Sequence, residues 1–255
     1  MKMNTLFPDM ARPLVFGHRG YSSLAPENTM EAFDLCVRRG VPGVELDVHL
    51  CKSGELVIIH DFRLKRLAGV DAEVEDLTYG ELKALDVGSH KDRRFAGARI
   101  PLLEELFARH GSRLYYDIEM KVRGTKDTGI ARKTWETIQD ANLQSHCMVS
   151  SFNPFALWHF NKACRRSIPT AVIYCVDEEV PRILQHGWGR HIARATVLKP
   201  EHAQVDRSML ERFSRNKSYP VVTWTVDDER LGRNLIGLGV AGIISNDPGQ
   251  FVSQR

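Results

Sequence analysis

Three acidic residues lie in apolar, strand-like segments where they could hold a metal ion. Glu45 and Asp47 are two positions apart in GVELDV, so both side chains point to one face of a strand. Glu119 lies near the end of a second such segment, LYYDIEMK. Oxygen ligands of this kind favour a hard cation, Mg²⁺ or Ca²⁺, over zinc. Taken alone, Glu45 and Asp47 could equally be solvated charges at the edge of a sheet.

A histidine follows the acidic pair in a predicted β-hairpin. The segment DVHLCKSGELVIIHD turns at Ser53–Gly54 and brings the chain back to His60. If the turn has two residues, His60 lies directly opposite Asp47, on the same face and about 4.5–5.5 Å away. A register shift of one residue would turn the imidazole to the other face.

Another histidine and two basic side chains occur at the ends of similar segments. His18 and Arg19 end the apolar run LVFGHR, and Lys121 follows Glu119 by two positions. A cation, two imidazoles and two basic side chains suit an oxyanion, for which phosphate is the obvious candidate. A purely structural His18 is the alternative.

Eight short, apolar, β-rich segments predict the framework that positions these residues. Their continuous apolar character is typical of parallel strands buried on both faces. They start near Leu14, Gly43, Leu114, Cys147, Ala171, Ala195, Val221 and Gly242. Six of the seven spacings are 21–33 residues, which fits one strand, one helix and two loops. The 255 residues therefore predict a single α/β domain over residues 1–255, a TIM-type (β/α)₈ barrel, whose usual length is about 250 residues.

The spacing between the second and third of these strands is 71 residues, which predicts an insertion after strand 2. The insertion covers about residues 48–100, begins with the hairpin and continues as a polar, irregular stretch. Segments that follow barrel strands lie on the C-terminal face, where active sites of this fold are built. We therefore expect the insertion to cap that face, and the three acidic residues to meet there around one ion.

Amphipathic stretches between the strands predict the outer helices. The clearest covers residues 28–39, where Asn28 and Glu31 have the spacing of a capping box and Gly40 ends the helix. Further helices are expected near residues 101–110, 128–141, 154–162, 207–215 and 228–238. The pattern over residues 182–194 is weaker because two glycines interrupt it.

The composition argues against several classes of protein. Hydrophobic residues make up 43% and charged residues 26% of the chain, as in a globular domain. A net charge of +3 falls short of the basic footprint of a nucleic-acid-binding protein. No apolar run approaches the roughly 20 residues of a transmembrane helix, and we find no apolar stretch of a signal peptide. Five scattered cysteines argue against disulfides and a zinc site, so we expect a cytoplasmic protein.

The order and spacing of the motifs resemble one known family. Four segments are closely similar to motifs of the glycerophosphodiester phosphodiesterase family: GHRGYSSLAPENTMEAF, the strand with Glu45 and Asp47 that leads into KSGELVIIHD, IEMK, and VVTWTVDD. The resemblance runs from about Leu14 to Pro248. It implies a (β/α)₈ barrel with an insertion after the second strand, where the long spacing occurs.

The resemblance also implies roles for the candidate residues. The acid–base pair would be His18 and His60. The ligands of a divalent cation, Mg²⁺ or Ca²⁺, would be Glu45, Asp47 and Glu119. The side chains in contact with the substrate would be Arg19 and Lys121 at the phosphate, and Trp224 of the WTV motif. A position in the core is the alternative for Trp224.

Two departures from the family's motifs lie near the C-terminal end. Asp227 stands where the family often has Asn, and Asn246–Asp247 stands where an Asp-x-Pro ending is common. We expect neither to touch the acid–base or metal set. Glu27 and Asn28 of the PENT motif are expected to shape a loop and cap a helix rather than to take part in chemistry.

The reaction implied by the resemblance is metal-assisted hydrolysis of a small-molecule glycerophosphodiester to glycerol 3-phosphate and an alcohol. The nucleophile would be water or the glycerol 2-hydroxyl. The residues leave open which histidine is the acid, whether a cyclic phosphate forms, the alcohol and the oligomeric state. One alternative is an intracellular lysophospholipase D-like activity, and another is a catalytically silent barrel that only binds such compounds or a partner protein.

Overall fold

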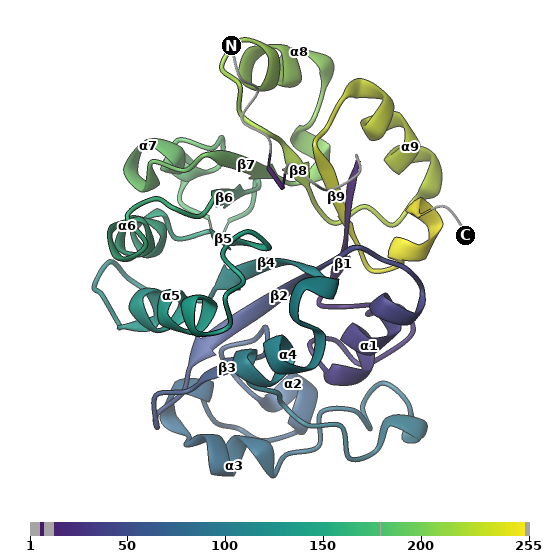
Figure 1. Ribbon diagram of the computed structural model, residues 1–255, viewed down its shortest axis with the longest axis vertical. Coiled ribbons are helices and arrows are strands. Elements are labelled where there is room, and N and C mark those ends of the chain that lie inside the picture. The colour runs from purple at the N-terminus through teal and green to yellow at the C-terminus, as the bar shows by residue number, and fades with distance from the viewer. Residues whose placement is uncertain (1–5, 8–12, 179, 253–255) are drawn as a thin grey trace.

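The chain forms a ring of parallel strands surrounded by helices (Figure 1). This computed structural model describes residues 6–7, 13–178 and 180–252. The parallel strands are β1 (Leu14–His18), β2 (Gly43–Leu50), β4 (Tyr115–Met120), β5 (Cys147–Ser151), β6 (Thr170–Tyr174), β7 (Val197–Pro200), β8 (Val222–Thr223) and β9 (Gly242–Ser245). They follow the order β7-β6-β5-β4-β2-β1-β9-β8, and isolated bridges such as Leu198 to Val221 join β7 to β8. The predicted eight-stranded barrel is confirmed.

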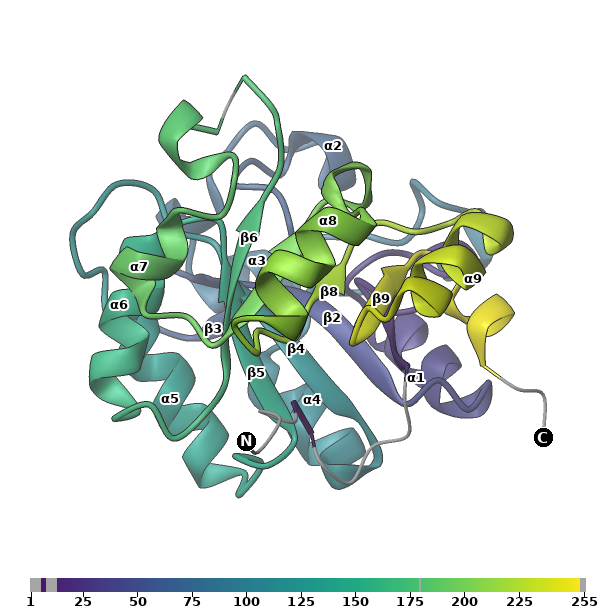
Figure 2. The ribbon, with the colours of Figure 1, turned by 90° about the horizontal axis from the view of Figure 1, so that it is seen from above.

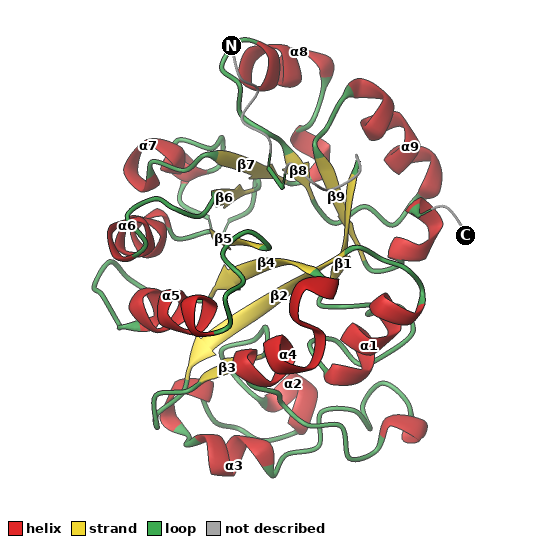
Figure 3. Ribbon diagram, viewed as in Figure 1, coloured by secondary structure: helices red, strands yellow, loops and turns green. Residues whose placement is uncertain are grey.

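Helices cover the outside of the ring (Figure 3). They are α1 (Met30–Arg38), α4 (Leu103–His110), α5 (Ile130–Asp140), α6 (Pro154–Ala163), α7 (Gly189–Ala193), α8 (Arg207–Leu210), which continues as a π-helical turn (Glu211–Arg215), and α9 (Glu229–Leu238). Figure 2 shows α5 and α6 on one side of the barrel and α1 and α9 on the other. Apolar side chains of these helices pack against the outward side chains of the strands and form the main core.

Alternation along the strands separates the side chains that point outward to the helices from those that point into the barrel. On β1, Val15 points into the main core, whereas Leu14 and Phe16 belong to a separate inner apolar cluster. The next inward position on β1 is His18. The same alternation buries four carboxylates on the inner side of β2 and β4: Glu45, Asp47, Asp117 and Glu119. The charged groups therefore gather at the C-terminal ends of the strands, above an apolar floor.

The chain between β2 and α4 forms a lobe, residues 51–102. It contains β3 (Leu56–Ile58), α2 (Lys65–Ala68) and α3 (Tyr79–Lys83), and β3 pairs with β2 in antiparallel orientation. The lobe has a hydrophobic cluster of its own, which includes Leu64, Val74 and Leu82. An ion pair of 2.7 Å between Arg66 and Glu27 connects the lobe to the loop that follows β1.

The hairpin of β2 and β3 has a register that differs from the predicted one. Its loop has three residues, 52–54, rather than two. Gly54 provides the positive φ, +95°, that such loops use. The Asp47 carbonyl accepts a hydrogen bond from Ile59 N at 3.0 Å. The prediction that His60 lies directly opposite Asp47 is therefore wrong by one residue.

Helix α1 is capped by Thr29 and not by Asn28. The hydroxyl of Thr29 accepts a hydrogen bond from Ala32 N at 3.4 Å. Asn28 has a positive φ of 56° and a buried side chain that points away from the helix. The predicted capping box of Asn28 and Glu31 is wrong, because the helix begins one residue later and Asn28 has a partner elsewhere.

Two predictions from composition can be compared with the described residues. None of their helices has both the length and the apolar character needed to cross a membrane. The cysteines are all free, buried thiols, as their scattered spacing predicts: Cys36, Cys51, Cys147, Cys164 and Cys175.

Gly17 in β1 allows a close approach of neighbouring chain segments. A Cβ atom at this position would lie 2.7 Å from both Cys36 Sγ and the carbonyl oxygen of Gly20. We predict that Gly17→Ala lowers the free energy of unfolding by about 1–3 kcal/mol, as overpacking of a core does. Urea denaturation of the purified protein measures this change.

Gly237→Ala is the matched control, because nothing lies within 4 Å of a Cβ placed there. Gly237 is inside α9, so alanine should raise the free energy of unfolding by up to about 1 kcal/mol. Equal stability of Gly17→Ala and the unmodified protein would contradict the close packing at β1.

Candidate active site

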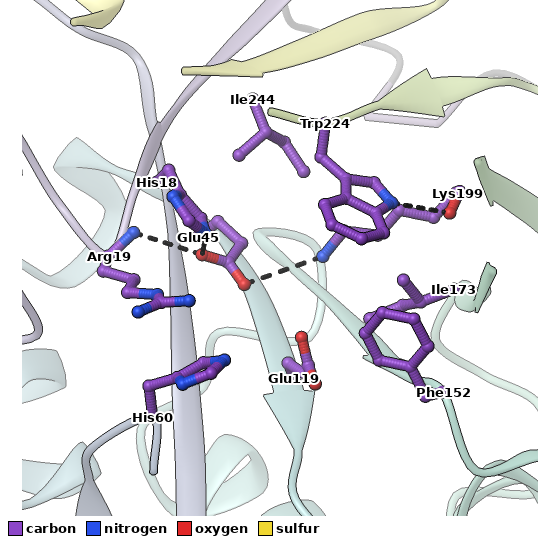
Figure 4. A pocket seen from close by; sticks show the side chains of 10 residues that line it. All are labelled: His18, Arg19, Glu45, His60, Glu119, Phe152, Ile173, Lys199, Trp224 and Ile244. Atoms are coloured by element: carbon purple, nitrogen blue, oxygen red, sulfur yellow. Dashed lines mark hydrogen bonds and ion pairs between the residues drawn. The ribbon is translucent and has the colours of Figure 1, made fainter. Parts of the chain in front are cut away.

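The register of neighbouring strands brings the candidate residues to one end of the barrel. His18 is the pairing partner of Glu45 across β1 and β2, and Asp47 is the partner of Glu119 across β2 and β4. A cavity of about 40 Å³ lies between them and is lined by both histidines (Figure 4). The expected convergence of strand ends is thus observed in the geometry.

Three of the buried carboxylates form a compact group. One oxygen from each of Glu45, Asp47 and Glu119 lies within 4.8 Å of the other two. The residues are only 1–7% exposed, which excludes solvated edge charges as an interpretation. Asp47 Oδ1 accepts no hydrogen bond from the described residues. An all-oxygen donor set that includes a buried oxygen without a hydrogen bond fits a hard divalent cation.

Basic side chains balance part of this negative charge. Lys121 Nζ lies 2.7 Å from Glu119 Oε1 and 3.2 Å from Asp47 Oδ1. Arg19 Nε lies 3.6 Å from Asp47 Oδ2. Burial alone would raise the pKa of Asp47, but Lys121, His60 and Arg19 hold it well below its ordinary value. Asp47 is therefore ionised at neutral pH and is a suitable ligand for a cation.

A buried lysine that the sequence did not single out completes the charge cluster. Lys199 Nζ on β7 lies 2.7 Å from Asp117 Oδ2 and 3.7 Å from Glu45 Oε1. Ser150 Oγ accepts a hydrogen bond from Lys199 Nζ at 3.1 Å. Burial and the neighbouring Asp47 charge raise the pKa of Glu45 to about 8, although Lys199 opposes this shift. Two features of the sequence could have predicted this pair: Asp117 lies two positions before Glu119, and Lys199 lies inside the apolar segment ATVLKP.

Asn246 holds His18 in one tautomer. Asn246 Nδ2 donates to Asp227 Oδ2 at 2.6 Å, since a carboxylate can only accept. The amide oxygen therefore faces His18 Nδ1 at 2.7 Å and accepts its hydrogen. The free lone pair is then on Nε2, 4.0 Å from Glu45 Oε2. Burial, with Arg19, lowers the pKa of His18 to about 4, so the ring is neutral at pH 7.

The expectation that Asn246 does not touch the acid–base set is therefore wrong, whereas Asp227 contacts Asn246 and not His18 itself. Asn246 directly follows β9, and Asp227 follows the short strand β8. Both loops leave the C-terminal end of the barrel, where the site lies. That position was the signal in the sequence that could have placed them beside His18.

His60 reaches the same cavity despite the shifted hairpin register. Strand β3 ends at Ile58, and the chain then leaves the strand pairing. In Figure 4 the ring lies across Glu45 from His18. His60 Nδ1 is 2.7 Å from Asp61 Oδ1. Burial opposes ionisation of Asp61, but Arg66 and His60 lower the pKa of this carboxyl group to about 2. The carboxylate orients the ring and can stabilise a positive charge on it.

The PENT loop also touches the site. Asn28 Nδ2 donates to Asp47 Oδ2 at 2.8 Å, so Asn28 orients a carboxylate rather than a helix. Glu27 accepts hydrogen bonds from Arg19 at 2.8 Å and from Arg66 at 2.7 Å. Burial opposes its ionisation, but the two guanidinium groups lower the pKa of Glu27 to about 2. These contacts fix Arg19 beside the cavity.

Trp224 lies on the apolar wall of the cavity. Its Nε1 donates to the Lys199 carbonyl at 3.0 Å, and its ring contacts Phe152 edge-on at 5.5 Å. Ile173 and Ile244 line the same wall (Figure 4). The cavity therefore has a charged side with both imidazoles and an apolar side, which suits a small molecule with an anionic group and a carbon skeleton.

The sequence matches one family over nearly its whole length. The sequence model of the glycerophosphoryl diester phosphodiesterase family matches residues 18–250. A glycerophosphodiester phosphodiesterase of Caldanaerobacter subterraneus subsp. tengcongensis is 34% identical over 248 residues, which cover 95% of this chain and 97% of the relative. One of Bacillus altitudinis is 33% identical over 250 residues, with 94% and 97% covered.

Solved structures share the fold. A phosphodiesterase of Oleispira antarctica in complex with the product sn-glycerol-3-phosphate has a TM-score of 0.78 and 27% identity, with 93% of this chain and 94% of that chain covered. A glycerophosphodiester phosphodiesterase of Thermotoga maritima has a TM-score of 0.73 and 27% identity, with 96% and 100% covered. The full-length match and the identity of these relatives establish that this chain belongs to the glycerophosphoryl diester phosphodiesterase family.

Proposed function

We propose that this protein hydrolyses glycerophosphodiesters to glycerol 3-phosphate and an alcohol with the help of a divalent cation. The observation that carries the proposal is one cavity lined by two imidazoles beside the buried group of Glu45, Asp47 and Glu119. The product sn-glycerol-3-phosphate in the Oleispira antarctica structure supports the same substrate class.

The proposed metal ligands are the three grouped carboxylates, and Mg²⁺ and Ca²⁺ both suit their oxygens. A bound cation would supply neutralisation of charge on the phosphate oxygens. Arg19 and Lys121 would contact the phosphate, because both cationic groups lie beside Asp47, Arg19 in the lining of the cavity and Lys121 in the lining of the adjoining groove. Trp224 would pack against the carbon atoms of the glycerol.

We assign the two histidines different roles on the basis of their partners. His18 has an amide partner at Nδ1 and a free lone pair at Nε2, so it would act as the base. His60 has a carboxylate partner, so it would act as the acid. The nucleophile, water or the glycerol 2-hydroxyl, gives its proton to His18 as its oxygen bonds to phosphorus. The bond from phosphorus to the alcohol oxygen breaks, and that oxygen takes a proton from His60. Attack by water gives glycerol 3-phosphate directly. Attack by the 2-hydroxyl gives a cyclic phosphate, which water then opens: the water gives its proton to His60, and the glycerol 2-oxygen that leaves phosphorus takes the proton from His18.

We predict that His18→Ala and His60→Ala each lower kcat for sn-glycero-3-phosphocholine by about 10²–10⁴-fold, as loss of a general acid or base does. Binding of Mg²⁺ or Ca²⁺, measured by isothermal titration calorimetry, should stay largely intact. His90→Ala, at an exposed position, is the control and should leave kcat unchanged. Near-normal turnover in either of the first two variants would remove that histidine from the acid–base pair.

We predict that Glu119→Gln weakens binding of Mg²⁺ or Ca²⁺ by at least about tenfold, because a charged ligand is lost. Calorimetry without substrate measures the affinity directly. Glu104→Gln, an exposed residue of α4, should bind the ion like the unmodified protein. Equal affinity of Glu119→Gln and Glu104→Gln would exclude Glu119 as a ligand.

We predict that Asn246→Ala lowers kcat by about tenfold or more with little change in KM, because the wrong tautomer of a catalytic histidine is costly. The ¹⁵N chemical shifts of His18 report the tautomer and should show a mixture in the variant. Asn216→Ala, at an exposed position, should change neither quantity. Unchanged ¹⁵N shifts in Asn246→Ala would contradict the positioning role.

A further inference from the structure

An open groove begins at Glu119 and Lys121 and leads away from the catalytic cavity. It encloses about 400 Å³ and shares Glu119 and Phe152 with the catalytic cavity. Beyond these residues its walls are largely apolar: Phe62, Val122, Pro154, Phe155, Pro181 and Leu184. The cavity and the groove therefore adjoin at these two side chains.

The charged side chains that line the groove directly, among the described residues, lie at the end shared with the catalytic cavity. Glu119 and Lys121 are the charged side chains among the described residues that line it, and they pair with each other at 2.7 Å. The remainder of the lining offers no ionic partner to a ligand. A charged group that entered the groove would lose water without gaining a counter-charge.

Two of the three aromatic rings that line the groove, those of Phe62 and Phe152, already contact other side chains. The guanidinium of Arg123 lies 3.9 Å from the centre of the Phe62 ring, which places a positive charge where a quaternary ammonium would bind. The Phe152 ring is in edge-on contact with Trp224. These rings therefore do not form a cage for a choline-like cation, whereas their exposed carbon atoms suit an aliphatic chain.

The position of the acid histidine indicates which part of the substrate enters the groove. His60 and Glu119 lie on the same side of Glu45 in Figure 4, and His18 lies on the other side. Phe62, two residues after His60, lines the groove. Under the proposed function, the alcohol takes its proton from His60, so the alcohol oxygen lies on the groove side. The glycerol then lies on the side of His18 and Trp224.

We infer that the groove binds the leaving alcohol and selects substrates whose alcohol carries an uncharged aliphatic chain. The inference rests on the proposed function and names its substrate class: glycerophosphodiesters of long-chain alcohols. Phe155 is 37% exposed, and a chain that lies against it removes apolar surface from water. Each methylene so buried contributes about 0.8 kcal/mol, or up to about fourfold in kcat/KM.

The test is a homologous series of sn-glycero-3-phospho-n-alkanols, from ethanol to octanol, with sn-glycero-3-phosphocholine for comparison. Release of glycerol 3-phosphate from each substrate is followed with the unmodified full chain. We expect kcat/KM to rise with chain length and the choline ester to be a poorer substrate than the alkanols of four or more carbons. If all esters are hydrolysed but kcat/KM does not change with chain length, the groove assignment is overturned while the proposed function stands.

Leu184→Asp places a charge in the groove and should abolish the rise with chain length, with the ethanol ester turned over as before. Ile183→Asp is the matched control, because Ile183 is the adjacent residue and is 72% exposed. It should retain the rise. Equal dependence of kcat/KM on chain length in both variants would overturn the inference. So would a series in which kcat/KM does not rise with the alkanol chain but is higher for lysophosphatidylcholine, whose acyl chain is on the glycerol. Hydrolysis of none of these esters would instead contradict the proposed function itself.

Discussion

A cluster of buried charges is the constraint on which the rest of the structure depends. Four carboxylates of β2 and β4 and the ammonium groups of Lys121 and Lys199 lie inside the barrel with almost no exposure to water. Such charges are costly to bury unless each is paired and hydrogen-bonded. Burial, together with the neighbouring Asp47 carboxylate, raises the pKa of Glu45 to about 8, and the four carboxylates outnumber the two ammonium groups. A divalent cation is the simplest group that relieves this excess.

The barrel makes this cluster possible through alternation along its strands. Leu14 and Phe16 fill the lower layer, and the next inward position of β1 carries His18. The apolar floor excludes water from below, which strengthens each electrostatic contact above it. Loops from distant parts of the chain then orient side chains of the candidate site. Asn28 holds Asp47, and Asn246 holds His18.

The sequence predicted the structural features that depend on hydrophobic periodicity and on the position of a residue along its strand. Continuous apolar runs indicated the eight strands, and spacing by two placed Glu45 and Asp47 on one face. Contacts between segments far apart in the chain carried no such signal. The hydrogen bond from Asn246 to His18 joins residues 228 positions apart, and Lys199 meets Asp117 across the barrel. The prediction of the hairpin register was wrong for a local reason, because Gly54 permits a three-residue loop as readily as a two-residue turn.

Identification of the product by ³¹P NMR tests the proposed metal-dependent hydrolysis most directly. The purified protein is incubated with sn-glycero-3-phosphocholine in the presence of Mg²⁺ or Ca²⁺, and again with EDTA. We expect the diester signal to be converted to that of glycerol 3-phosphate, and this conversion to be lost in EDTA. Hydrolysis at the same rate in EDTA would contradict a catalytic cation at Glu45, Asp47 and Glu119. Phosphocholine and glycerol as products would contradict the assigned direction of bond cleavage.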